Sequence, residues 1–422
     1  MKKLLSYIVV SLIVISSLPA QTIQLTLDEC QSKARDNYPL IKQYGLISRS
    51  EKFNLENAGK SYLPQVTLNA QATYQSDVTK LPIDISQFGM DIPSMSKDQY
   101  KATIDINQVI WDGGQTSAQQ GIIKANTAVE QQSLEVNLYQ IRDRVNQLYF
   151  GILSIDKQIA ILKLNTESLN TTLDFVNASF RNGTAMQSDI DAIQVEILNI
   201  EQQTTELKAS RKSYTDMLSV FIKQEITPEH QLTTPNSAIV AEQNNRPELF
   251  YYNKQLELLN KQETAISAKN MPNIGLFTQG GYGRPGLNML EDQFKLFAIG
   301  GVKLTWKFGN LYTKKNEQRL IETQRQLVNI QEETFLFNNT MESSQTSNEI
   351  QKYKNLLEKD TQIIALRERV KNASDSKYRN GIYTINDLIK DINAENQARQ
   401  TMALHEIQYL YSIYNYNNIK GY

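Results

Sequence analysis

Apolar and polar residues alternate strictly in several short segments of this 422-residue chain. The apolar positions are Val66, Leu68, Ala70, Ala72 and Tyr74 in one segment, Tyr100, Ala102, Ile104 and Ile106 in the next, and Phe294, Leu296, Ala298, Val302, Leu304, Trp306 and Phe308 in a third. A period of two residues predicts strands with one apolar and one polar face. The pattern suits either a half-buried hairpin or tilted transmembrane strands of ~9–11 residues.

Long connections join the strands of the two predicted hairpins. They read SDVTKLPIDISQFGMDIPSMSKD from Ser76 and GGYGRPGLNMLED from Gly280. The second is rich in glycine, but it has no Gly-Lys-Ser/Thr and a strand follows it, so it does not predict a phosphate-binding loop. Long loops are typical of the outer side of outer-membrane barrels, which favours the membrane interpretation.

A seven-residue repeat of apolar positions follows the first hairpin. Its members are Leu134, Leu138, Ile141, Val145, Leu148, Ile152, Ile155, Ile159, Leu162, Leu169, Leu173, Val176 and Phe180. This repeat predicts a helix over 115–182 that packs on other helices with a left-handed supercoil. A weaker repeat predicts a second long helix over 311–380. At a rise of 1.5 Å per residue, each helix would be ~100 Å long.

Four shorter helices are expected in addition. The residue before a proline disfavours the helical conformation, so Pro64 and Pro272 end two of them. The four predicted helices cover 28–59, 187–222, 245–270 and 385–417. Stacked in pairs, the first on the last and the second on the third, they would match the two long helices in length. The chain would then form four rods of similar length next to four strands.

The chain repeats its own landmarks in the same order. FRNG at Phe180 matches YRNG at Tyr378 at an offset of 198 residues, and YLP at Tyr62 matches NMP at Asn270 at an offset of 208. NYPLI matches NRPELF, and the tryptophans of QVIWDGG and VKLTWKF align. Ordered matches of this kind predict a duplication. The predicted division is a first repeat over 21–222, a proline-containing linker over 223–239 and a second repeat over 240–422.

The N-terminus carries an export signal. Residues 1–20 contain two lysines, an apolar run and a small residue, Ala20, at the expected cleavage site. Its apolar core is too short for a good spanning helix. Cys30 lies well past the cleavage site, so the bacterial lipoprotein pattern is missing and no lipid anchor is predicted. Cys30 is expected to be a small core residue of the first helix.

Charge and composition exclude several classes of function. Without the signal, 42 basic residues stand against 45 acidic ones, and this balance does not favour nucleic acid or an anionic membrane surface. One cysteine and two distant histidines, His230 and His405, predict no disulfide framework and no metal site. No catalytic triad signature, metal cluster or nucleotide loop is present, so neither an enzyme nor a cofactor is expected.

The repeated Arg-Asn-Gly motif predicts two helix reversals. Gly183 and Gly381 follow the long helices and can adopt the left-handed conformation that commonly ends a helix. Ser188–Asp189 and Asn386–Asp387 are expected to supply N-cap oxygens and a favourable negative charge to the helices that follow. Both turns are therefore expected at the far tip of the helical rods.

These motifs together resemble the TolC-type outer-membrane efflux proteins, also called outer membrane factors. The resemblance covers LTLDEC, NYPLI and its repeat NRPEL, the YLP and NMP strand entries, QVIWDGG, and the paired turns FRNGTAMQSD and YRNGIYTIND. It implies an α+β membrane protein that forms a homotrimer. Four strands from each chain would close a 12-stranded transmembrane β-barrel, and the long helices would close an α-helical periplasmic barrel. Independently, four strands are too few to close a barrel.

The resemblance also implies partners and sites. A periplasmic adaptor protein would contact the reversal turns at Arg181, Asn182, Gly183, Arg379, Asn380 and Gly381. Candidates for the narrow mouth of the tunnel are Asp189, Asp387, Lys390 and Asp391. Lys390 stands where some relatives have an acid, which argues against a purely acidic mouth. Trp111 and Trp306, at the ends of two strands, are expected at the membrane interface, although packing at a strand-to-helix joint explains them equally well.

The expected function is a passive exit duct in the outer membrane of a Gram-negative bacterium, with most of its mass in the periplasm. With the adaptor and an inner-membrane transporter, it would export small molecules. The outer-membrane component of a type I-like protein secretion system would have the same fold. A periplasmic coiled-coil protein without a pore would explain the seven-residue repeat but leaves the hairpins without a role.

Overall fold

The structure of the protein is a computed structural model. It describes residues 24–79, 95–227, 230–236, 238–239 and 243–422, so the predicted signal at 1–20 and the centre of the first hairpin loop lie outside the described residues. The chain forms two compact units. Unit 1 comprises Met1–Ile41, Glu135–Pro247 and Leu336–Tyr422, and unit 2 comprises Lys42–Leu134 and Glu248–Phe335.

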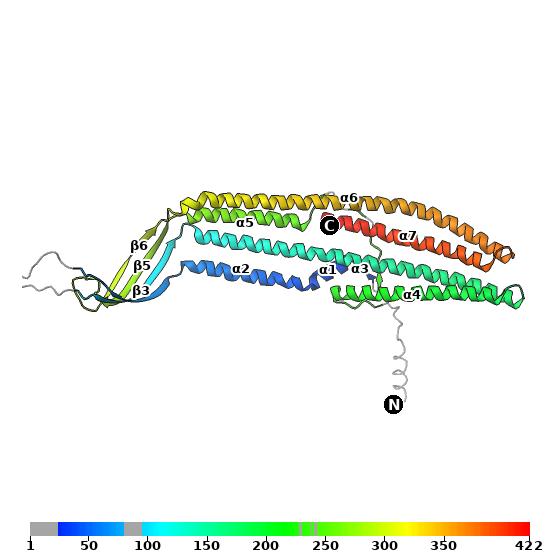
Figure 1. The fold of residues 1–422 in the computed structure, drawn as a ribbon, viewed down its shortest axis with the longest axis horizontal. Coiled ribbons are helices and arrows are strands. Elements are labelled where there is room, and N and C mark those ends of the chain that lie inside the picture. Colours follow the sequence, from blue (N-terminus) through cyan, green and yellow to red (C-terminus); the bar gives the residue numbers. More distant parts are fainter. Residues whose placement is uncertain (1–23, 80–94, 228–229, 237, 240–242) are drawn as a thin grey trace, which may run out of the picture. The chain divides into compact units, whose positions relative to one another are not determined.

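Unit 2 contains a four-stranded antiparallel sheet (Figure 1). Its strands are β2 (Gln65–Tyr74), β3 (Asp98–Trp111), β5 (Asn273–Arg284) and β6 (Lys295–Thr305). Their order is β2-β3-β5-β6, so β3 and β5 join the two predicted hairpins into one sheet. The loop predicted from Gly280 is shorter than expected, because the residues through Arg284 continue β5 and pair with β3.

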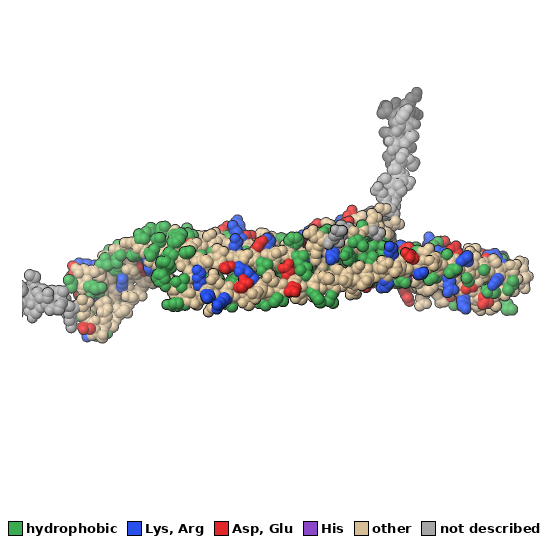
Figure 2. Space-filling model, turned by 90° about the horizontal axis from the view of Figure 1, so that it is seen from above, with side chains coloured by type: hydrophobic (Ala, Val, Ile, Leu, Met, Phe, Trp, Pro, Cys, Tyr) green, Lys and Arg blue, Asp and Glu red, His purple; other side chains and the backbone are tan. Residues whose placement is uncertain are grey.

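The two faces of the sheet differ in polarity, as the alternation predicts. On one face Leu68 pairs with Ile104, and Ala70 pairs with Ala102. This apolar face is open in the single chain, where Leu68 is 74% and Leu296 83% exposed. In Figure 2 a band of hydrophobic side chains covers this part of unit 2. Asn69, Asp105 and Gln279 lie together on the opposite face, which is polar.

Helices adjoin the sheet in unit 2. They are α2 (Gln43–Gly59), the short 3-10 helix η3 (Lys60–Tyr62), nearly all of α5 (Pro247–Lys269), and the first parts of α3 (Gln115–Arg181) and α6 (Asn310–Arg379). Asp112 fixes the passage from β3 to α3. Its carboxylate accepts hydrogen bonds from the Tyr62 hydroxyl at 2.8 Å and from the Gly114 and Thr116 backbone N–H groups at 2.9 and 2.7 Å.

Unit 1 is helical and contains the main apolar core. Its helices are α1 (Leu27–Asn37), α4 (Gln187–Ile222), α7 (Ile385–Lys420) and the remaining parts of α3 and α6. One apolar cluster joins α3, α4 and α7 through Leu162, Leu169, Val176, Ile190, Ile193, Ile200, Ile385, Leu388 and Ile392. Most of the predicted seven-residue repeat of α3 is buried, whereas its last member, Phe180, is exposed.

Helix boundaries agree with the predictions to within three residues, with one exception. The helix predicted over 28–59 is broken. Helix α1 ends at Asn37, a 3-10 turn η2 covers Pro39–Lys42, and α2 begins at Gln43. Tyr38 is extended, with φ −69° and ψ 133°, because the ring of Pro39 disfavours the helical conformation in the residue before it. The sequence contained this signal, and the prediction of one continuous helix was wrong.

The segment predicted as a linker is tied to unit 1. Strand β4 (Gln231–Leu232) pairs in parallel with β1 (Gln24–Leu25). The buried Tyr149 hydroxyl lies 2.8 Å from the carbonyl of Leu25 and 2.7 Å from that of Thr233. Cys30 is fully buried in α1, which confirms its predicted place in the core. Burial raises the pKa of its thiol to about 11.

The compact units cut across the two predicted repeats, since each unit contains parts of both. The division into repeats at 21–222 and 240–422 is based on sequence landmarks and stays a prediction. Among the described residues, no helix combines the length and the apolar composition that crossing a membrane requires.

Candidate functional site

The two reversal turns of unit 1 have the same backbone geometry. Gly183 and Gly381 both adopt φ +74°, as the sequence predicts. At the first turn the Gly183 N–H donates to the Phe180 carbonyl at 2.9 Å and the Thr184 N–H donates to that of Ser179 at 2.9 Å. The same pair of bonds recurs at Gly381 and the residue that follows it, also at 2.9 Å. This is the Schellman arrangement that ends many helices.

The side chains around the turns are open to solvent. The stretch 181–184 is exposed, as are Arg379, Asn380 and Gly381. Asn380 donates to the Ser376 carbonyl at 2.8 Å. No atom lies within 4 Å of the position that a Cβ would occupy at Gly183 or Gly381. Glycine is therefore needed at these positions for its backbone conformation and not for space.

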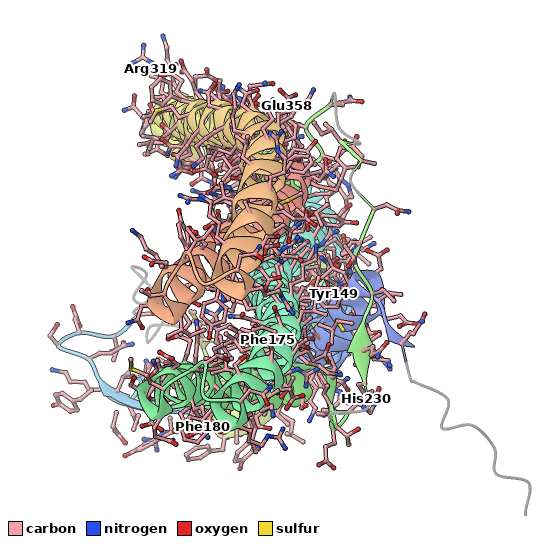
Figure 3. All side chains as sticks on the ribbon, turned by 90° about the vertical axis from the view of Figure 1, so that its right-hand side faces the viewer. Tyr149, Phe175, Phe180, His230, Arg319 and Glu358 are labelled. Carbon is pink, nitrogen blue, oxygen red and sulfur yellow. The ribbon has the colours of Figure 1, made fainter. Side chains whose placement is uncertain are left out.

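Behind the turns, an aromatic contact links α3 with α6. The Arg379 guanidinium lies 4.4 Å from the ring centroid of Phe175, which is labelled in Figure 3. The rings of Phe175 and Tyr378 are 6.2 Å apart in an edge-on arrangement. Asp375 holds Arg379 from the other side, with an Nε–Oδ2 distance of 2.9 Å. Phe175 is not among the predicted site residues, because it lies one residue off the apolar repeat.

The predicted acids lie in the first turns of α4 and α7, but they are not the N-caps. The N-cap residues are Met186 and Thr384, whose backbones are extended. Asp189 accepts from the Met186 N–H at 2.9 Å, and Asp387 accepts from the Thr384 N–H at 3.1 Å. The prediction of N-caps at Ser188–Asp189 and Asn386–Asp387 is thus corrected by a shift of two to three residues. Bonds from the Thr384 hydroxyl and N–H lower the pKa of Asp387.

The other two candidates for the tunnel mouth lie on α7 and differ in their surroundings. Lys390 is exposed. Asp391 accepts a hydrogen bond from Ser374 of α6. Its carboxylate therefore faces the neighbouring helix of the same chain, which the sequence did not predict.

The bond between Ser374 and Asp391 belongs to a series of side-chain bridges between α6 and α7. Asp360 meets His405 at 2.7 Å, Glu368 meets Arg399 at 3.5 Å, and Lys371 meets Glu395 at 2.8 Å. The two residues of each pair lie nearly equally far along the chain on either side of the second turn. Opposite charges at such mirrored positions are the sequence signal that could have predicted Glu368–Arg399 and Lys371–Glu395.

Glu395 is, with Asp360, one of two buried acids in this series. Burial by itself would raise its pKa, but hydrogen bonds and charges from Lys371 and Arg399 outweigh burial and lower it. The Arg399 Nη2 lies 2.6 Å from Glu395 Oε1. Helices α3 and α4, in contrast, pack mainly through apolar side chains in this part of unit 1.

The two tryptophans lie at strand ends in unit 2. Trp111 is the last residue of β3, and Trp306 directly follows β6. Both are nearly half exposed. The indole N–H of Trp306 donates to the Asn270 carbonyl at 3.1 Å, and its ring lies 4.7 Å from that of Phe308. Trp306 therefore packs at the joint between α5 and β5 while part of its ring stays open.

Comparisons with known proteins agree with this architecture. The family described as outer membrane efflux protein matches residues 32–218. No curated protein sequence matches the chain. Among solved structures, the outer membrane protein VceC of Vibrio cholerae superimposes with a TM-score of 0.63 at 14% identity, covering 94% of this chain and 96% of VceC.

Two further channels have the same fold. CusC, whose structures concern folding and transmembrane channel formation, has a TM-score of 0.68 at 12% identity, over 94% of this chain and 92% of CusC. The outer membrane channel CmeC of Campylobacter jejuni has a TM-score of 0.63 at 13% identity, and the match covers 94% of this chain and 85% of CmeC. With residues 32–218 matched to the family and its fold shared over nearly the whole chain, the resemblance to the TolC-type outer membrane efflux proteins is confirmed.

Proposed function

We propose that this protein is a passive trimeric exit duct of the outer membrane that exports small molecules together with a periplasmic adaptor and an inner-membrane pump. The observation that carries the proposal is the open apolar face of the sheet. Four strands expose a continuous set of apolar side chains, and within the chain β2 and β6 each have one edge that pairs with no other described strand. A lipid environment favours such a face, provided that the edges are closed.

Closure requires more than one chain. About eight strands are the practical minimum for a barrel, and this chain supplies four to its sheet. Pairing of β6 of one copy with β2 of the next would close twelve strands in a trimer. Trp111 and Trp306 would then lie at the end of the barrel where its strands meet the helices, at the level of the lipid headgroups. A coiled-coil protein without a pore would leave the exposed apolar face of the sheet unexplained.

The reversal turns are the proposed contacts for the adaptor. Arg181, Asn182 and Gly183 form one exposed surface, and Arg379, Asn380 and Gly381 form its counterpart. Asp189, Asp387 and Lys390 lie within nine residues of these turns and are the proposed lining of the tunnel mouth. Asp391 is less suited to line the mouth, because its carboxylate already accepts a hydrogen bond from Ser374.

The detergent-corrected mass of the protein extracted from outer membranes tests the duct. We expect three copies of the mature chain, and protein that leaves the membrane only with detergent. A stable monomer, or a protein recovered from the soluble periplasmic fraction, would contradict the duct and favour the coiled-coil alternative.

A further inference from the structure

The polar face of the sheet carries more positive than negative charge. Four charged side chains belong to the strands on this face, namely Lys101 and Asp105 on β3 and Lys295 and Lys303 on β6. Strands β2 and β5 add neutral residues there, among them Asn69 and Gln279, which pair in register with Thr103 and Asp105.

Packing establishes that β3 and β6 direct these residues to the same side. A Cβ placed on Gly281 would lie 2.5 Å from the ring of Phe297 and 2.8 Å from Thr103, so these two side chains converge over the glycine. Lys101 Nζ lies 5.1 Å from the centroid of the Phe297 ring. The β5–β6 register runs without a shift from Lys295 to Thr305. Alternation therefore places Lys303 on the face of Phe297.

The one negative charge on this face is held by neutral hydrogen-bond donors and acts electrostatically on Lys101, so the three lysines leave the face with a net positive charge. Asp105 accepts hydrogen bonds from Asn69 at 2.6 Å, from Gln279 at 2.5 Å and from Thr103 at 3.1 Å. Lys295 forms an ion pair with Glu291 of the adjoining loop. Lys101 and Lys303 have no ion-pair partner among the residues that the structure describes.

We propose that Lys101 and Lys303 give the strand section of the duct a preference for anionic solutes. This inference rests on the proposed function, because the polar face lines a lumen only if the apolar face meets lipid in a closed barrel. A trimer would then present two lysines from each chain to the passing solute. Rings of lysine or arginine favour anions in pores, because they raise the local concentration of the opposite charge.

Reversal potentials in planar bilayers test the inference. The purified full-length trimer is measured in a KCl gradient at low salt, where the screening length is about 30 Å at 0.01 M. The wild-type chloride-to-potassium permeability ratio is the reference, because Asp189 and Asp387 of the proposed tunnel mouth act on this ratio as well. The double variant Lys101→Gln/Lys303→Gln should lower the chloride-to-potassium permeability ratio by roughly twofold, and the difference should fade near 1 M salt.

Matched variants separate charge from shape. Lys101→Arg/Lys303→Arg keeps both charges and should keep the wild-type ratio, whereas Asp105→Asn should shift the ratio further toward chloride. A conducting trimer whose ratio is the same in the glutamine variant would overturn the inference and leave the duct intact. A trimer that conducts no ions would overturn the duct itself, and the inference with it.

Discussion

At the scale of single residues, two glycines determine where the long helices reverse. Gly183 and Gly381 share one left-handed conformation, and the space around each is open. A Cβ would meet no group there beyond the adjoining residues, so the main effect expected of a substitution is backbone strain. A residue other than glycine that is held in this region costs about 1–3 kcal/mol, and asparagine tolerates it better than β-branched residues do.

We predict that Gly183→Val and Gly381→Val weaken export and leave the trimer intact, because valine strains the turns without touching the sheet. Gly183→Asn and Gly381→Asn are the matched controls and should retain most of the activity. Export by cells that carry each variant, together with the mass of the extracted protein, checks this. Full transport in both valine variants would argue against the turns as the adaptor contact.

At the scale of elements, the two helical hairpins of unit 1 are held together differently. Helices α3 and α4 share the apolar cluster around Leu169 and Ile193, to which α7 also contributes, and the ion pair Asp156–Arg211 also joins them. Helices α6 and α7 are joined by polar bridges, among them Lys371–Glu395 and Asp360–His405. Because hydrogen bonds to charged groups depend on protonation and apolar contacts do not, α6 and α7 are expected to be the more pH-sensitive pair.

The lowered pKa of Glu395 determines in which direction the stability changes with pH. The stabilisation from its ionised carboxylate is fully present above the unfolded pKa, near 4.5, and is lost as the pH falls through the lower folded value. Glu395→Gln should lower the free energy of unfolding by about 1–3 kcal/mol at pH 7. Below pH ~4.5 the stability of this variant should fall less steeply than that of the wild type. Thermal unfolding followed by helical circular dichroism measures both effects.

Glu358→Gln is the control for this prediction, since Glu358 is exposed on α6, the helix that neighbours Glu395 of α7 (Figure 3). It should leave both the stability and its pH profile unchanged. Equal behaviour of the two variants would show that Glu395 is not the origin of the pH dependence.

At the scale of the whole molecule, the chain leaves apolar residues of α6 uncovered. In unit 1 these include Ile363, Leu366 and Val370, which follow the spacing of a helical seam. In unit 2 Leu327 and Ile330 are also exposed. Contiguous exposed apolar residues mark interaction surfaces. In the proposed trimer, neighbouring copies would cover them.

We therefore predict that Leu366→Glu weakens the trimer, because it places a charge in an apolar contact. Gln362→Glu adds the same charge at an exposed polar position of α6 and should have little effect. The mass distribution over a dilution series in detergent distinguishes the two. If Leu366→Glu stays as trimeric as Gln362→Glu, the exposed residues of α6 are not the interface.

The sequence by itself determined the features that short-range physics controls. Alternation predicted the faces of the strands, the seven-residue repeat predicted the buried side of α3, and glycine after Asn182 and Asn380 predicted both reversals. Each depends on neighbours within a few residues, and so can be read locally. The break in the first helix before Pro39 also depends on neighbouring residues, and the proline in the sequence was sufficient to predict it.

Only the tertiary structure decided which distant groups meet. It paired β3 with β5, set Arg379 on Phe175, directed Asp391 to Ser374 and brought Lys101 and Lys303 to one face of the sheet. These contacts join residues from separate helices and strands, and their geometry depends on strand register and helix rotation. A single sequence does not encode either quantity in a local pattern, because many registers and rotations satisfy the same alternation of apolar and polar residues.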